Sequence, residues 1–245
     1  MELKKVAQKI RTAGYLVALT GAGISADSGL PIFRGKNGIW NKIDPDKVAT
    51  IEAFEKYPER FWKFHIQMLS LVLKAVPNAG HKALAELETS GFLKLLITQN
   101  VDDLHERAGS QKIVKLHGDI WTVICPKCGF MDRLSEVPTQ IPPRCPECEN
   151  ILKPNVVLFG ELLPPDAITE AISACKKADL ILVIGTSGSV MPAGSLPLIV
   201  KNHGGEIIEI NTEPSAITKF ADMFIQGRAA NVLPKILKEL KESNS

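Results

Sequence analysis

Short apolar runs alternate along most of the chain with segments in which apolar residues recur at helical spacing. The runs predict buried strands at residues 15–20, 93–98, 113–116, 180–185 and 206–210. Helical spacing is clear in two sets, Ala79, Ala83, Leu84 and Leu87, and then Ala167, Ile168, Ala171, Ile172 and Cys175. Because strands that alternate with helices build parallel sheets covered on both faces, the pattern predicts an α/β fold.

Two regions depart from this alternation. Residues 36–76 are aromatic and helical, whereas residues 121–155 are rich in cysteine and proline. We expect both to be insertions that together form a smaller domain over the ligand-binding edge of the sheet. The main domain would then comprise residues 1–35, 77–120 and 156–245.

A glycine-rich string follows the first predicted strand. Gly21, Gly23 and Ala26 fit the turn of a dinucleotide-binding fold, in which two glycines admit a pyrophosphate and a small third residue lets a helix pack closely. The helix that should follow is cut short by Gly29 and Pro31, and no second apolar strand ending in an acidic residue follows it. The string therefore predicts a Rossmann-like, doubly wound parallel sheet that binds its dinucleotide differently from a dehydrogenase.

Four cysteines form a C-x2-C-x16-C-x2-C array, Cys125 with Cys128 and Cys145 with Cys148. Two thiolates three positions apart on a tight turn can reach one ion, and two such turns complete a tetrahedron. Four soft ligands leave no position for water, so we predict a structural Zn²⁺; a redox dithiol pair and an iron–sulfur cluster are the alternatives. Cys175 lies on the apolar face of a predicted helix and is expected in the core.

Polar residues follow two of the predicted strands, where open α/β sheets place ligand chemistry. Gln99, Asn100 and Asp102 come directly after the strand at 93–98. Alone, an Asn or Asp there would more often be a helix cap, but a cluster beside a glycine-rich loop favours function. His117 ends the next strand, and an imidazole suits proton transfer near neutral pH.

Composition excludes some classes of protein. The 245 residues carry 29 basic and 27 acidic side chains, and no long basic run, so we expect neither direct nucleic-acid binding nor attraction to a membrane. The first residues keep helical spacing and are not expected to be a signal peptide, and no apolar stretch is long enough to span a membrane. Five cysteines, four of them in metal-type pairs, favour a reducing compartment. We expect a cytoplasmic protein and a monomer, although nothing in the sequence fixes its oligomeric state.

Longer strings carry a resemblance to a known family. Residues 21–35 read GAGISADSGLPIFRG, residues 98–109 read TQNVDDLHERAG, and residues 153–161 read KPNVVLFGE. With the cysteine array and His117-Gly118, they resemble the sirtuins, NAD-dependent protein lysine deacylases, of the prokaryotic type with a minimal catalytic core. The resemblance covers roughly residues 12–230. It implies a Rossmann-like sheet with a smaller inserted zinc-ribbon and helical domain.

The resemblance implies that NAD is consumed as a co-substrate. His117 would be the general base, while Asn100 and Asp102 would organise the nicotinamide pocket and act as catalytic residues. Asn211 would hold the adenosine ribose. The expected cofactor contacts are Gly21, Ala22, Gly23, Ala26, Phe33, Arg34, Gln99, Asn100, Val101, Asp102, His117, Gly185, Thr186, Ser187, Asn211 and Ala229.

The resemblance also implies an acetylated-lysine protein or peptide as substrate. Residues 153–161 would pair with the extended peptide by strand addition, which recognises backbone more than side chains. The expected substrate contacts are Val157, Phe159, Gly160 and Glu161. Family members that remove acidic acyl groups carry a Tyr and an Arg where this chain has His65 and Met68. Without a guanidinium, a succinyl carboxylate lacks a bidentate partner, so we expect acetyl or a longer apolar acyl group.

Two other functions fit much of the same sequence. A protein ADP-ribosyltransferase would break the same glycosidic bond and pass ADP-ribose to a protein nucleophile. A non-catalytic reader would bind NAD or acyl-lysine without turnover. The peptide-binding string and His117 favour deacylation over both, because a reader needs no base.

Overall fold

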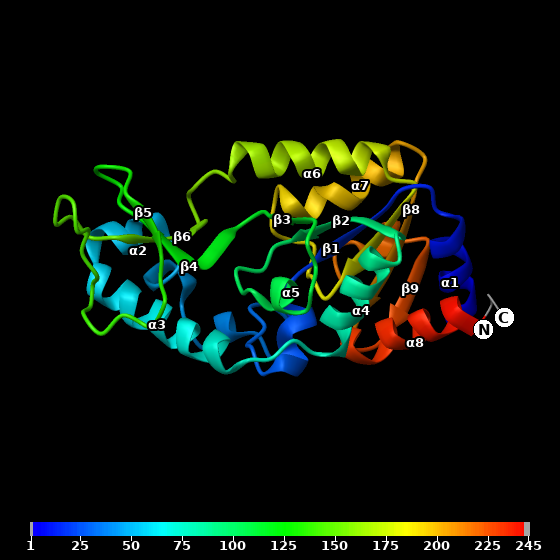
Figure 1. Ribbon diagram of the computed structural model, residues 1–245, viewed down its shortest axis with the longest axis horizontal. Helices are drawn as coiled ribbons and strands as arrows, with labels where there is room; N and C mark the ends of the chain where they lie inside the picture. Colours follow the sequence, from blue (N-terminus) through cyan, green and yellow to red (C-terminus); the bar gives the residue numbers. More distant parts are fainter. Residues whose placement is uncertain (1, 243–245) are drawn as a thin grey trace.

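The computed structural model describes residues 2–242. A six-stranded parallel sheet runs in the order β3-β2-β1-β7-β8-β9 (Figure 1). Its strands are β1 (Leu16–Thr20), β2 (Leu93–Thr98), β3 (Ile113–Lys115), β7 (Leu180–Ile184), β8 (Glu206–Asn211) and β9 (Met223–Gln226). From β1 the chain adds β2 and then β3 on one side, and it returns to add β7 on the other side of β1. The direction in which strands are added therefore reverses between β1 and β7. Such a switch point opens a crevice at the carboxyl ends of the strands.

Helices cover both faces of this sheet. Figure 1 shows α6 (Pro165–Lys177) and α7 (Leu196–Asn202) above it, and α4 (Ala79–Thr89) and α8 (Ala229–Glu242) below it. The helix α1 (Glu2–Thr12) packs beside α8 on the lower face. Each face of the sheet therefore buries its own apolar core, as expected of a doubly wound fold.

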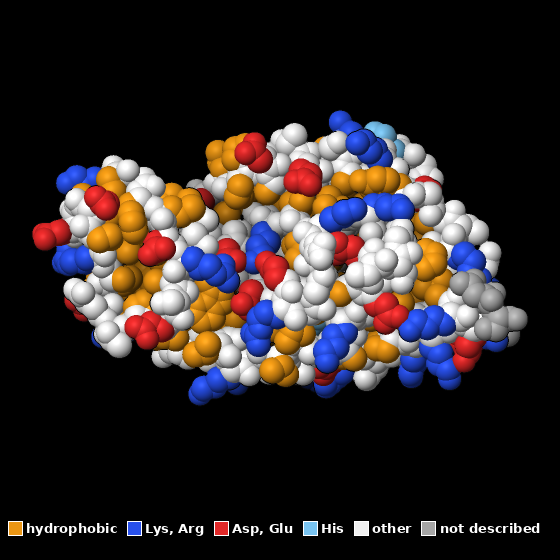
Figure 2. All heavy atoms as spheres, viewed as in Figure 1, with side chains coloured by type: hydrophobic (Ala, Val, Ile, Leu, Met, Phe, Trp, Pro, Cys, Tyr) orange, Lys and Arg blue, Asp and Glu red, His pale blue; other side chains and the backbone are white. Residues whose placement is uncertain are grey.

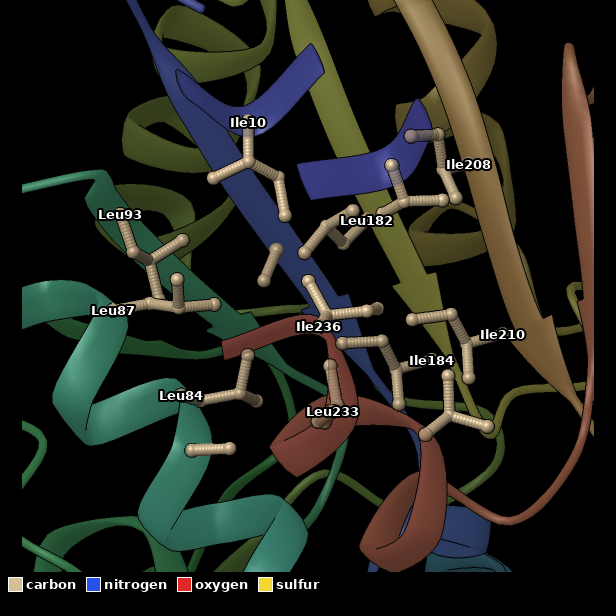
Figure 3. Packing of buried hydrophobic residues seen from close by; sticks show 14 of the residues in the cluster. Ile10, Leu84, Leu87, Leu93, Leu182, Ile184, Ile208, Ile210, Leu233 and Ile236 are labelled. Atoms are coloured by element: carbon tan, nitrogen blue, oxygen red, sulfur yellow. The ribbon is translucent and has the colours of Figure 1, made fainter. Parts of the chain in front are cut away.

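The strands are apolar because both of their faces are buried. Every residue of β1 and β7 is buried, and alternate side chains enter opposite cores. Figure 3 shows the lower core, where residues of α1, α4 and α8 converge on residues of the sheet. Its labelled members are Ile10, Leu84, Leu87, Leu93, Leu182, Ile184, Ile208, Ile210, Leu233 and Ile236.

A smaller module lies at the other end of the molecule (Figure 1). It contains an antiparallel sheet in the order β5-β4-β6, made of β4 (Gly118–Ile124), β5 (Met131–Arg133) and β6 (Lys153–Val156). The helices α2 (Ile51–Lys56) and α3 (Pro58–Lys74) pack with it around Trp62, whose Nε1 donates to Leu152 O at 2.9 Å. Since β4 begins at Gly118 and β6 ends at Val156, the boundaries expected at residues 120/121 and 155/156 fall inside these two strands.

The remaining elements are short and lie mostly in connections. They are α5 (Leu104–Arg107) and the 3₁₀ helices η1 (Ala22–Ser28), η2 (Ile39–Asn41), η3 (Pro45–Lys47), η4 (Ala193–Ser195) and η5 (Thr218–Phe220). No helix among the described residues is long and apolar enough to cross a membrane.

Candidate active site

A cavity of about 1570 Å³ lies at the carboxyl ends of β1, β2, β7 and β8, between the large sheet and the small module. The space-filling view shows an indentation in the outline where the smaller lobe meets the larger body (Figure 2). All of the expected cofactor and substrate residues, from Gly21 to Ala229, line this one cavity. The volume exceeds that of a pocket for one drug-sized ligand, so it can hold a dinucleotide together with a second group.

The glycine string has a structural reason beyond ligand access. Gly23 N donates to Gly185 O at 2.8 Å, and a Cβ at Gly23 would lie 2.7 Å from Gly185 Cα. A Cβ at Gly21 would lie 2.8 Å from Thr186 Cβ. The glycines thus let the loop after β1 pack against the loop after β7 across the switch point. The following 3₁₀ helix η1 ends at Gly29, which has φ = 86°, as the sequence predicted.

Asn100 and Asp102 are buried at the base of the cavity and are joined by Ser25. Asn100 Nδ2 donates to Ser25 Oγ (3.2 Å), and Ser25 Oγ donates to Asp102 Oδ2 (3.0 Å). Burial raises the pKa of Asp102, opposed by hydrogen bonds from Leu104 N and Ser25. Ser25 was not among the residues that the sequence singled out, although it lies inside the glycine string.

His81 contacts this group through Ser25. Because its Nδ1 accepts from Asn78 N (3.3 Å), its Nε2 carries the proton and donates to Ser25 Oγ at 3.3 Å. Burial lowers the pKa of His81 to about 4, so the ring is neutral. The side chain therefore fixes Ser25 and, through it, the carboxylate of Asp102.

His117 is oriented by the backbone of the neighbouring strand end. Its Nδ1 lies 2.8 Å from Gln99 O, and since a carbonyl only accepts, Nδ1 carries the proton. The other ring nitrogen, Nε2, is then left with a lone pair. Burial lowers the pKa of His117, opposed by the bond to Gln99 O. A neutral imidazole with a free acceptor nitrogen beside a cavity is suited to act as a general base.

The far end of the cavity is built from β7 and β8. Gln99 Nε2 donates to Thr186 Oγ1 (2.9 Å), and Asn211 Nδ2 donates to Thr186 O (2.9 Å). These bonds join the ends of β2, β7 and β8 into one polar wall. The cavity also opens to Glu213 and Ser215, which the sequence analysis did not name.

The segment after β6 forms another wall. Within residues 2–242, β6 pairs with β4 alone and is an edge strand of the small sheet, and Phe159 further along is 40% exposed. Glu161 lines the same cavity, and its Oε2 accepts from Leu158 N (2.8 Å) and pairs with Lys153 Nζ (2.9 Å). Its side chain therefore holds the shape of the segment.

The four paired cysteines come together in the small module, with all Sγ atoms within 4.8 Å of one another. Cys125 and Cys148 are 3.5 Å apart at sulfur, as are Cys128 and Cys145, too far for a disulfide. A tetrahedral ion with Zn–S bonds of about 2.3 Å requires sulfurs about 3.8 Å apart, so the thiols fit Zn²⁺.

The two cysteine turns have matching backbones. Gly129 N donates to Cys125 O (3.0 Å) and Glu149 N donates to Cys145 O (2.9 Å), and both residues have positive φ, 76° and 59°. Glycine adopts this conformation freely, whereas Glu149 adopts it against its usual preference. Cys175 is buried in the α6 core, and burial raises its pKa to about 12.

The sequence model of the Sir2 family matches residues 21–192, and the chain belongs to this family. It is 48% identical to an NAD-dependent protein deacylase of Thermococcus kodakarensis, over 98% of this chain and 96% of that protein. It is 47% identical to NAD-dependent protein deacylase 1 of Archaeoglobus fulgidus, over 99% of both chains.

Solved structures give the same assignment. A Sir2 homologue in complex with NAD matches with a TM-score of 0.93 at 47% identity, over 99% of this chain and 95% of that one. Sir2Af2 bound to a myristoylated histone peptide matches with a TM-score of 0.85 at 38% identity, over 99% and 98% of the two chains. The expected fold class and family are confirmed.

Proposed function

We propose that this protein is an NAD-dependent protein lysine deacylase, which converts acyl-lysine and NAD to lysine, nicotinamide and O-acyl-ADP-ribose. The observation that carries the proposal is the orientation of His117. Its Nδ1 is hydrogen-bonded to Gln99 O at 2.8 Å, and it lines the same cavity as Asn100 and Asp102. Membership of the Sir2 family and the deacylase relatives support it. The chain uses NAD and carries a cysteine site for structural zinc.

The chain's own residues would divide the work as follows. Bound NAD supplies a ribosyl carbon that the acyl oxygen can attack as nicotinamide leaves. Asn100 and Asp102, held by Ser25, would receive and orient the nicotinamide carboxamide. His117 Nε2 would then take a proton from a ribose hydroxyl, because its other nitrogen is committed to Gln99. Phe33 would shield the reacting ribose from water, and Arg34 would help hold the phosphates.

The acylated peptide would bind along residues 153–161. β6 is an edge strand, which supports strand addition, a binding mode in which main-chain hydrogen bonds give affinity and leave the target sequence loosely specified. Val157 and Phe159 would line the path of the acyl-lysine, and Gly160 would contact the peptide. The metal-type thiols support a reducing compartment, the cytoplasm.

The acyl end of the cavity is apolar. It is lined by a buried His65 and by five apolar residues, Phe61, Met68, Leu71, Val72 and Ile120. Burial lowers the pKa of His65 to about 4, and its Nε2 lies 3.3 Å from Ile120 O, so the ring is neutral and already bonded. A succinyl carboxylate would thus be desolvated there without a cationic partner.

We expect a preference for acetyl or a longer apolar group over succinyl of about 10²-fold or more in kcat/KM, equivalent to about 3 kcal/mol of unpaired desolvation. Steady-state kinetics with acetyl-, long-chain acyl- and succinyl-lysine peptides of one sequence measure it. Comparable turnover of the acetyl and succinyl peptides would contradict this account of the acyl site.

The pH dependence follows from the state of His117. The base works as neutral imidazole, and burial lowers its pKa below the ordinary 6.5. Activity is therefore lost only as pH falls through that lowered value, so the acid limb of kcat/KM for NAD should be centred below pH 6.5. A pH profile at saturating peptide checks this, and an acid limb centred above 6.5 would contradict it.

The direct test of the function follows nicotinamide and free lysine peptide together by chromatography. Deacylation requires that both appear in equal amounts, and only when NAD and acyl-peptide are both present. Nicotinamide without loss of the acyl group would favour the ADP-ribosyltransferase, and binding without any product would favour the reader.

A further inference from the structure

Glu209 carries a buried carboxyl group on β8, the strand next to the edge strand β9 of the large sheet. It is 0% exposed on β8, where it shares a face with Ile207, a member of the core beneath α6 and α7. Burying a polar group this deeply is unfavourable unless it is hydrogen-bonded. Among residues 2–242 its two hydrogen bonds both come from neutral donors, Thr218 Oγ1 at 2.6 Å and Asn211 Nδ2 at 3.3 Å.

The contact with Asn211 fixes the direction of an amide. Asn211 Nδ2 donates to Thr186 O (2.9 Å) and to Glu209 Oε1, so both of its hydrogens face the protein. Its Oδ1 accepts from Thr212 N (3.0 Å) and retains a second lone pair beside the cavity. Asn211 is therefore presented to a ligand as an acceptor, which suits a ribose hydroxyl.

The contact with Thr218 anchors a loop. Thr218 Oγ1 donates to Glu209 and accepts from Ser215 N (2.7 Å). The adjoining Ala216 N donates to Ser187 O (3.1 Å), which joins the same loop to the end of β7. Residues of this loop, including Ser215, form the floor of the cavity next to Asn211.

We propose that Glu209 is a positioning residue for the adenosine half of NAD. It does not line the cavity, and it acts by setting the amide of Asn211 and by holding the loop at Thr218. The proposal rests on the proposed function, since it takes the ligand at Asn211 to be NAD. The adenosine end is remote from the reacting ribose, so loss of the carboxyl group should weaken NAD binding and leave the chemical step intact.

The test is Glu209→Gln, which keeps the shape of the side chain and replaces one acceptor oxygen with a donor. We expect KM for NAD and the Kd of ADP-ribose, measured by calorimetry, to rise about five- to tenfold. The kcat and the KM for the peptide should stay within about twofold. Thr218→Val, at a half-buried position, removes one of the two contacts and should shift the same two constants less.

Asp222→Asn is the matched control. Asp222 supports the opposite end of β8 by accepting from Ile207 N (2.8 Å), and lies outside the cavity. This variant should lower the melting temperature and leave KM for NAD unchanged. A Glu209→Gln protein with unchanged KM and Kd, or with kcat and peptide KM altered as much as KM for NAD, would overturn the proposal.

A double variant separates the two routes. On an Asn211→Ala background, Glu209→Gln should add less to the Kd of ADP-ribose than it does alone, because one of its contacts is already absent. If Glu209→Gln raised the Kd of ADP-ribose by the same factor on that background, the route through Asn211 would be overturned. A parent protein that binds neither NAD nor ADP-ribose would overturn the proposed function itself. An active parent in which Glu209→Gln changes neither constant would overturn only this inference.

Discussion

Replacing His117 with alanine is expected to lower kcat for deacylation by about 10²- to 10⁴-fold, the usual contribution of a positioned general base. The effect follows from the free Nε2, which the bond between Nδ1 and Gln99 O leaves as the acceptor. Steady-state kinetics with an acetyl-lysine peptide measure the loss. The Kd of ADP-ribose should change little, since the phosphate and adenosine contacts remain.

His203→Ala provides the control for this prediction. His203 lies at the end of α7, outside the cavity, with its Nδ1 near Ile199 O. This variant should retain parental kcat. Undiminished deacylation by the His117 variant would show that another group accepts the proton.

Removal of the metal is expected to have the second large effect. Structural zinc sites supply about 10–16 kcal/mol of apparent binding energy, comparable to the whole stability of a typical domain. Cys125 and Cys145 are buried in the small-module core, so a Cys145→Ser variant loses an ion ligand and a core contact together. We expect the small module to unfold, with a lowered melting temperature and no deacylase activity.

The measurements are metal analysis, melting temperature and activity before and after chelation. One zinc per chain is expected, and Cys175→Ser, which changes a buried cysteine outside the cluster, should retain it. Iron in place of zinc would favour the alternative of an iron–sulfur cluster. A chelated protein with unchanged stability and activity would contradict a structural role for the ion.

The large sheet could be predicted from sequence because its strands are buried on both faces. Continuous apolar runs located β1, β2, β3, β7 and β8 to within one residue at each end. β9 was not predicted, since Met223 and Phe224 are half-buried and Gln226 is exposed. The short β5 has three exposed residues, so it leaves no hydrophobic pattern at all.

The position of the candidate site could be predicted from the polar residues at strand ends. The hydrogen bonds inside the site could not. Asn100, Asp102 and His117 could be picked out because polar residues follow apolar runs there. Ser25 contacts Asp102, and Asn211 contacts Thr186, across separations of 77 and 25 residues. Such contacts depend on how the loops meet, so a single sequence contains no spacing that reveals them.

The glycine string shows a related limit. The string was predicted to form a phosphate loop, and its glycines line the cavity, but the packing of Gly23 against Gly185 came only from the structure. A loop that must pack against a second loop and admit a ligand has two reasons for glycine. Sequence alone cannot separate them.

The central claim is tested most directly by mass spectrometry of one reaction that contains the purified protein, NAD and an acetyl-lysine peptide. The account predicts deacetylated peptide, nicotinamide and O-acetyl-ADP-ribose in equal amounts, with none formed by the His117→Ala protein. ADP-ribose attached to protein, with the acetyl group intact on the peptide, would contradict it.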